Sequence, residues 1–254
     1  MHFLSLLEIS IIGFLAQIID GTLGMGYGVT SAALLISLGI NPVMASASVH
    51  TSEVFTTFVS GISHFKFGNI RKDLLWPLIS FGIIGGIIGA FGLVKLPLQL
   101  IRLVVGLILL SMGGLILYRF MFRYKKINSS EIKKYPVNRL RALGFLAAFI
   151  DAVGGGGWGP ICTPSLVITG TEPNKAVGSV DLAEFFVTIA ITITFLFFIG
   201  TNNFRWDLVV ALLTGGIIAA PIAAFSCKKL PKRLLGIFVG MIVIIFSLRM
   251  LLKR

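Results

Sequence analysis

The chain has 254 residues, of which 56% are hydrophobic and only 13% are charged. A soluble globular domain carries about 25% charged residues, so the composition excludes that class and predicts an integral membrane protein. The formal net charge is +12, but the basic residues gather in short segments between apolar runs. That distribution is typical of cytoplasmic loops and does not indicate a nucleic-acid-binding surface.

The first half opens with segment 4–38, which is apolar at both ends and glycine-rich in the middle, from Asp20 to Gly28. Glycine runs interrupt helices, and interrupted backbone at membrane depth is tolerated only where it is buried in protein or lines a cavity. Each of the later segments is long enough to span a bilayer. These spans are 43–65, which is polar, 74–94 and 98–118.

The second half repeats this order. Segment 143–169 is interrupted between Asp151 and Pro160, and three further spans follow at 174–199, 208–227 and 234–252. The hydrophilic segment 123–141 is too short to be a domain and is expected to be a cytoplasmic linker. The chain therefore divides into a first transmembrane repeat, 1–122, and a second, 142–254.

A shift of 131 residues aligns the two halves. Asp20 then meets Asp151, His50 meets Asp181, and Glu53 meets Glu184. Hydrophobic bias alone does not produce matches at acidic, glycine and proline positions, so we infer an internal duplication. The other matches include Gly24 with Gly155, Gly26 with Gly157, Gly28 with Gly159, Pro42 with Pro173 and Thr57 with Thr188.

Charge indicates that the copies are inverted. Loop 66–72 is basic and its counterpart 202–207 is nearly neutral, whereas 228–233 is basic and its counterpart near Lys95 is weakly charged. Basic loops face the cytoplasm, so equivalent loops lie on opposite sides and both termini lie outside. The predicted fold is an all-α integral membrane protein of two inverted repeats, each with three full transmembrane helices and a glycine-rich, broken, re-entrant hairpin. Secondary transporters have this architecture.

The glycine-rich centres are the first candidates for a substrate site. Broken helices leave backbone N–H groups that bind anions, and glycine lets a ligand approach the backbone; close packing through small residues is the alternative. Tyr27 and Trp158 occupy equivalent positions in the two repeats and are expected to line the wall of the substrate cavity. The candidates are Gly24, Gly26, Tyr27, Gly28, Gly155, Gly156, Gly157, Trp158 and Gly159.

Acidic residues accompany both centres. Asp20 and Asp151 directly precede the glycines and are expected to cap helices, because a carboxylate facing an anion site would repel the ligand.

Two polar stripes follow, with residues spaced by three or four so that they share a helix face. His50, Thr57 and Thr188 are expected to contact substrate, and Glu53 and Glu184 are expected either to couple transport to an ion or to support the fold. Asp181 lies three residues from Glu184, on the same helix face. A neighbouring carboxylate disfavours ionisation and so raises the proton affinity of Glu184. We therefore expect Glu184 to be the proton carrier and Glu53 to be the structural partner. His50 could pair with Asp181 across the twofold axis or bond to backbone.

The paired motif resembles that of the sulfite exporter TauE/SafE family of membrane permeases. It comprises an acidic residue, a glycine cluster, a Gly-x-x-Pro step at 39–42 and 170–173, and an Ala–Ser–Glu stripe. The resemblance implies transport of sulfite, sulfonates or related organosulfur and carboxylate anions. The first copy departs from the pattern, since Leu23 and Met25 stand where the second copy has Gly154 and Gly156.

The predicted function is a secondary transporter of a small anion across the cell membrane, which is the inner membrane where the source has two. An anion channel is the alternative. An intramembrane enzyme is not expected, because the His-Glu-x-x-His metal motif is absent. No P-loop is present, and Cys162 and Cys227 have no ligand spacing, so no metal or other cofactor is expected. The expected partners are the anion and the bilayer, and a homodimer is left open.

Overall fold

The computed structural model describes residues 3–123, 135–226 and 231–252, and the described residues are almost entirely helical. Most of the predicted linker, and Cys227, lie outside these ranges. The helices of the first half are α1 (Phe3–Leu23), α2 (Tyr27–Ser37), α3 (Pro42–Lys66), α4 (Lys72–Lys95), α5 (Leu98–Tyr118) and a π-helical turn (Arg119–Arg123). Those of the second half are α6 (Val137–Gly154), α7 (Trp158–Ile168), α8 (Pro173–Ile199), a 3-10 turn (Thr201–Asn203), α9 (Trp206–Ser226) and α10 (Lys232–Leu252).

Six of the described helices are long and apolar enough to cross a membrane. They belong to α1, α4, α5, α8, α9 and α10. Helix α3 has 25 residues but is too polar to count by composition. Helices α2 and α7 have 11 residues each, and at 1.5 Å per residue they reach only about 16 Å, half of a hydrocarbon core. The chain is thus a multi-pass, all-helical membrane protein.

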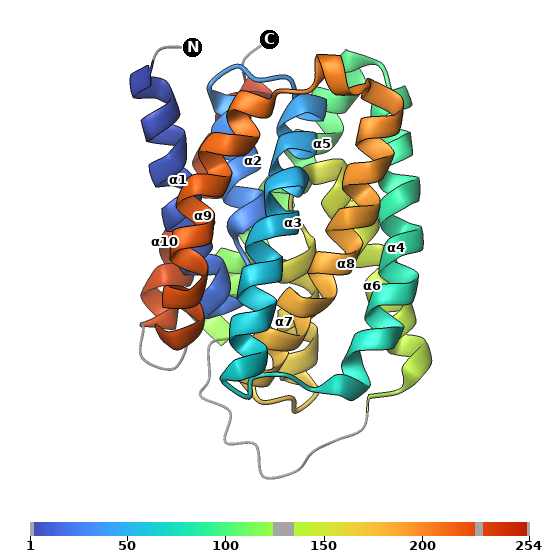
Figure 1. Cartoon of the computed structure of the whole chain (residues 1–254), viewed down its shortest axis with the longest axis vertical. Helices are drawn as coiled ribbons and strands as arrows, with labels where there is room; N and C mark the ends of the chain where they lie inside the picture. The colour runs from blue at the N-terminus through green and yellow to red at the C-terminus, as the bar shows by residue number, and fades with distance from the viewer. Residues whose placement is uncertain (1–2, 124–134, 227–230, 253–254) are drawn as a thin grey trace.

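The two short helices turn back at the glycine-rich segments (Figure 1). In that view α1 descends from the upper end and α2 returns to it, whereas α6 rises from the lower end and α7 returns there. Both chain termini lie at the upper end, and α5 finishes at the lower end, where α6 begins. The hairpins α1–α2 and α6–α7 therefore open toward opposite ends of the bundle.

Helices α3 and α8 run antiparallel through the middle of the bundle. A Cβ atom on Gly178 would lie 2.9 Å from His64 Cβ, and one on Gly61 would lie 3.0 Å from Leu182. Farther along, the ring centroids of Phe58 and Phe185 lie 5.1 Å apart, with the rings tilted by 44°. Residue numbers rise on one helix as they fall on the other, and His64 of one polar stripe lies 3.6 Å from Asp181 of the other.

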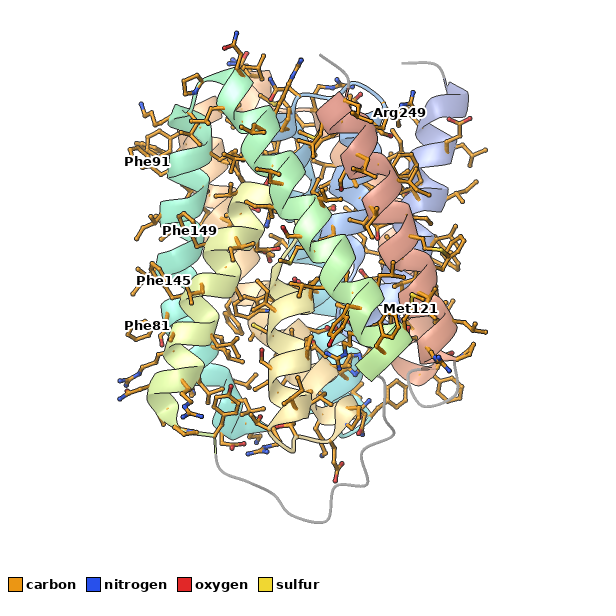
Figure 2. All side chains as sticks on the ribbon, turned by 180° about the vertical axis from the view of Figure 1, so that it is seen from behind. Phe81, Phe91, Met121, Phe145, Phe149 and Arg249 are labelled. Carbon is orange, nitrogen blue, oxygen red and sulfur yellow. The ribbon has the colours of Figure 1, made fainter. Side chains whose placement is uncertain are left out.

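The outer surface is apolar. Figure 2 shows Phe81, Phe91, Phe145 and Phe149 projecting outward along one edge of the bundle. Phe91 is 44% exposed and Trp76 is 76% exposed. A continuous apolar surface of this kind is stable when lipid is the solvent.

Charged residues are unevenly divided between the two ends of the bundle. The upper end in Figure 1, where α4 and α10 end and α5 and α9 begin, has Lys95, Arg102, Arg205 and Arg249 at or near those helix ends. The lower end, where α3 and α5 end and α4, α6, α8 and α10 begin, has the larger group of described basic residues: Lys66, Arg71, Lys72, Arg119, Arg139, Arg141, Lys175 and Arg233.

Candidate functional site

The helix interruptions depend on glycine. Gly24 and Gly26 connect α1 to α2 with φ angles of 64° and 129°, and Gly155 ends α6 with a φ of 72°. These values lie in a region that side chains with a Cβ rarely adopt. The sequence therefore stops each long helix and reverses the chain at this depth.

The two interruptions pack directly against each other. A Cβ atom on Gly156 would lie 2.0 Å from the backbone nitrogen of Val29, and one on Gly28 would lie 2.8 Å from the Gly155 carbonyl oxygen. Thr163 Oγ1 donates a hydrogen bond of 2.6 Å to the Gly24 carbonyl. The predicted glycines thus meet at the interface between the repeats, where only glycine leaves room for the opposite backbone.

An aspartate closes each interruption. The backbone N–H of Tyr27 donates to Asp20 Oδ1 over 3.4 Å, and that of Trp158 donates to Asp151 Oδ1 over 3.2 Å. Each carboxylate therefore reaches from the end of a long helix to the first N–H group of the short helix that follows. This placement satisfies a donor that the helix start leaves unpaired, and an anion at the same N–H would have to displace it.

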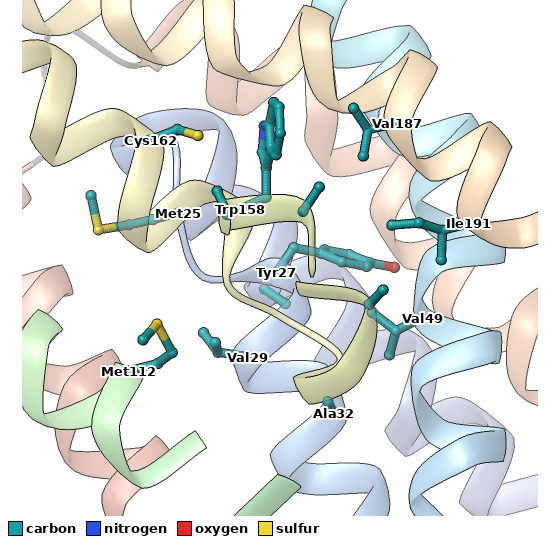
Figure 3. Packing of buried hydrophobic residues seen from close by; sticks show 14 of the residues in the cluster. Met25, Tyr27, Val29, Ala32, Val49, Met112, Trp158, Cys162, Val187 and Ile191 are labelled. Atoms are coloured by element: carbon teal, nitrogen blue, oxygen red, sulfur yellow. The ribbon is translucent and has the colours of Figure 1, made fainter. Parts of the chain in front are cut away.

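Tyr27 and Trp158 lie in a packed core. Their exposed fractions are 2% and 0%, and Figure 3 shows both among buried apolar side chains that include Val187 and Ile191. The Tyr27 hydroxyl lies 3.0 Å from Ser52 Oγ, and the Trp158 indole N–H donates to the Val180 carbonyl over 3.1 Å. Both expected cavity-wall residues are therefore closed off in this conformation.

The carboxylates form two equivalent clusters. We call Asp20, Asp181 and Glu184 the acidic cluster, in which each residue offers an oxygen and these oxygens all lie within 4.8 Å of one another. The corresponding histidine cluster comprises Asp151, His50 and Glu53. Here His50 Nε2 lies 3.1 Å from Asp151 Oδ2, and Glu53 follows His50 by three residues on α3, so the two side chains share a helix face. Each cluster joins the long hairpin helix of one repeat to the polar helix of the other.

The pairing of His50 differs from the one considered from the sequence. His50 pairs with Asp151, and its Nδ1 lies 2.8 Å from the Ser46 carbonyl oxygen. Asp181 instead lies beside His64, at 3.6 Å, and accepts a hydrogen bond of 2.6 Å from Ser60. Both residues are fully buried.

The two candidate threonines are occupied by their own helices. Thr57 Oγ1 donates to the Glu53 carbonyl, and Thr188 Oγ1 donates to the Glu184 carbonyl over 2.9 Å. This back-bonding is common for threonine within helices. A substrate would therefore compete with a backbone acceptor for either hydroxyl.

A polar chain that the sequence did not indicate leads from the lower end to the acidic cluster. Asn174 Nδ2 donates to Asn69 Oδ1 over 3.1 Å, and Asn69 Nδ2 lies 3.2 Å from His64 Nδ1. The other ring nitrogen of His64 faces the Gly21 carbonyl at 3.2 Å and Asp181. Asparagines beside helix ends usually cap helices, so their positions in the sequence gave no sign of this role.

Comparisons with known proteins identify the family of the chain. The model of the family described as "Sulfite exporter TauE/SafE" matches residues 9–250. The chain is also 46% identical over 252 residues to a protein of Bacillus subtilis (strain 168) described as "Probable membrane transporter protein YtnM", covering 98% of this chain and 83% of that protein. No solved structure matches. The protein is thus a membrane transporter of the sulfite exporter TauE/SafE family.

Proposed function

We propose that the protein is a secondary transporter that carries a small anion, such as sulfite, a sulfonate or a related organosulfur or carboxylate anion, across the cell membrane by alternating access. The observation that carries this proposal is the meeting of two half-length helices, one from each repeat, at buried glycine interruptions flanked by equivalent carboxylates. Secondary transporters bind substrate where broken helices of two repeats meet. We assign the chain no catalytic role.

We propose that the repeats are inverted in the membrane, each with three full crossings and one re-entrant hairpin. The antiparallel pairing of α3 with α8 and the opposite openings of the hairpins support this orientation. The lower end in Figure 1 carries most of the described basic residues and is the cytoplasmic end by the positive-inside rule. Association as a homodimer stays a prediction.

Burial of the candidate residues favours alternating access over an open channel. Tyr27, His50, Glu53 and Trp158 are each exposed by 2% or less. An anion can reach them only after the repeats move relative to each other. The backbone contact between the glycine interruptions is the interface at which we propose that this motion occurs.

We propose that a cation accompanies the anion. Carboxylates beside an anion site repel the ligand unless a cation neutralises them, so cation and anion binding would be coupled reciprocally. The sequence predicts a proton as this cation and Glu184 as its carrier, with Glu53 as the structural partner. Asp20, Asp181 and Glu184 hold oxygens within 4.8 Å of one another, whereas the cluster of Glu53 contains His50, so Glu184 has the more acidic surroundings of the two glutamates.

Reconstituted vesicles test the proposal. Uptake of labelled sulfite and of a labelled sulfonate is measured with and without an imposed pH gradient, for the wild type and for Glu184→Gln and Glu53→Gln, which keep hydrogen bonding but remove the charge. We expect gradient-driven accumulation in the wild type and its loss in Glu184→Gln with retained anion binding. Absence of uptake of either anion by folded wild-type protein, with every gradient tried, would contradict the proposed function.

A further inference from the structure

Hydrogen bonds join the two repeats at the lower end of the bundle, where α3 ends and α8 begins. The backbone N–H of Arg71, just before α4, donates to Ser179 Oγ on α8 over 2.8 Å. The Arg71 guanidinium donates to Thr171 Oγ1, in the connection between α7 and α8, over 3.4 Å. One corner of the first repeat is thus held against one corner of the second.

Two more side chains of the second repeat bind the same corner. Lys175 Nζ donates to the Gly68 carbonyl over 2.6 Å, and Asn174 Nδ2 donates to Asn69 Oδ1 over 3.1 Å. We call these two bonds, together with the two that Arg71 makes to the second repeat, the lower clasp. Because every bond of the lower clasp crosses from one repeat to the other, the clasp must break when the repeats separate at this end.

A glycine allows the lower clasp to close. A Cβ atom on Gly178 would lie 2.2 Å from the Asn69 carbonyl oxygen and 2.9 Å from His64 Cβ, whereas ordinary contacts begin at 3.4 Å. Any larger residue at this position would therefore push the α3–α4 connection away from α8. The equivalent residue of the first repeat, 131 positions earlier, is Ala47, which carries that Cβ atom. The α8–α9 connection therefore cannot approach α3 at the upper end as closely as the α3–α4 connection approaches α8.

The upper end also lacks most of the polar groups of the lower clasp. The side chains that the second repeat contributes have apolar equivalents in the first: Ile40 for Thr171, Val43 for Asn174 and Met44 for Lys175. Ser48, the equivalent of Ser179, keeps its hydroxyl, but Ser48 Oγ is buried and has no hydrogen-bond partner among the described residues. Buried polar groups are normally hydrogen-bonded, so Ser48 lacks in this conformation a bond that its counterpart makes.

We propose that the lower clasp is a gate that holds the transporter closed at the lower end, and that most molecules are closed at this end when no anion is bound. Alternating access in inverted-repeat transporters moves one repeat against the other, so closure at one end requires opening at the other. Closure at the lower end is stabilised by the clasp. Closure at the upper end has only the Ser48 hydroxyl in its place and meets the Ala47 Cβ atom, so the equilibrium favours the first state.

This inference rests on the proposed alternating access and adds to it which end the protein closes by preference. The distance between the repeats at each end can be measured without any anion. A failure of the gate is therefore distinguishable from a failure of the proposed transport.

The test is a pair of distances, measured by double electron–electron resonance on the purified full chain in lipid nanodiscs. In a chain whose native cysteines are replaced by alanine, spin labels are attached at Lys72→Cys and Glu172→Cys for the lower end, and at Leu38→Cys and Asn202→Cys for the upper end. All four positions are exposed, and each pair joins one repeat to the other. Without anion we expect one predominant distance at each end.

Two variants open the gate by copying the other repeat. Gly178→Ala introduces the Cβ atom of Ala47, and we expect it to raise the ratio of lower-open to lower-closed molecules about tenfold. Asn174→Val introduces the side chain of Val43 and removes one hydrogen bond, for which we expect about a fivefold rise. Both should appear as a longer distance for the lower pair and a shorter one for the upper pair, and most strongly in the double variant. Gly92→Ala is the control, because no atom lies within 4 Å of its added Cβ.

Two results would overturn the inference. The first is a lower-end distance in the folded variants equal to that in Gly92→Ala, which would mean that the lower clasp does not hold this end closed. The second is a longer lower distance with an unchanged upper distance, which would mean that the clasp fastens a connection without governing the repeats. If Gly178→Ala fails to fold, Asn174→Val alone decides.

Discussion

Substitution of Gly156 by alanine tests the contact between the two helix interruptions. The added Cβ would lie 2.0 Å from the backbone nitrogen of Val29 and 2.4 Å from the Gly28 carbonyl carbon. Ordinary contacts begin at 3.4 Å, so the two backbones must separate by about 1.4 Å. Overpacking of this kind costs about 1–3 kcal/mol, and we expect about 3 kcal/mol because neither atom can rotate away.

The assay is thermal unfolding of the reconstituted or detergent-purified variant at a fixed heating rate. For a chain of this length, a loss of about 3 kcal/mol corresponds to a fall in the midpoint of about 6–12 °C. Gly92→Ala is the matched control, because no atom lies within 4 Å of its added Cβ and alanine is the better helix former. A midpoint of Gly156→Ala equal to that of Gly92→Ala would refute the packing of the interruptions.

Three further predictions follow from the same structure. Gly157→Leu should abolish anion flux while the protein still inserts and folds, because a bulky side chain blocks approach of the anion to the backbone N–H groups. Flux equal to that of the wild type would show that this interruption is not part of the transport path. His50→Leu should lower stability by about 3–5 kcal/mol, because the buried Asp151 loses the partner that lies 3.1 Å away; an unchanged unfolding midpoint would argue against this pairing. In a chain without native cysteines, Asn202→Cys should react with an impermeant reagent from outside and Lys66→Cys only after permeabilisation, whereas labelling of both from one side would disprove the inversion.

Much of the helical fold could be predicted because membrane thickness fixes helix length. Segments of about 20 apolar residues have few alternatives to a transmembrane helix, and α4, α5, α9 and α10 follow the predicted spans closely. The interruptions were also predictable, since the glycine clusters mark them at Gly24 and Gly155. The direct contact between the interruptions was not, because sequence does not show which backbone fills the space beside a glycine.

Side-chain partners were harder to predict than equivalent positions. Repeat alignment relates His50 to Asp181, but residues related by a twofold axis touch only where they lie on the axis. Away from the axis, a residue of one repeat contacts a residue of the other repeat that is not its own equivalent. The structure accordingly joins His50 to Asp151 and places Asp181 with Asp20. Once the contact between His50 and Asp151 is known, the repeat alignment predicts that Asp181 lies beside Asp20. Without one known contact, the alignment predicts neither pair.

Counterflow in vesicles tests the central claim most directly. Vesicles loaded with unlabelled sulfite or sulfonate are diluted into medium that contains the labelled anion, and entry of label is compared with that into empty vesicles. A transporter that alternates between two sides is expected to take up label faster and transiently above equilibrium when the inside is loaded. Entry of label without transient accumulation, and at a rate independent of internal anion, would contradict alternating access and indicate a channel.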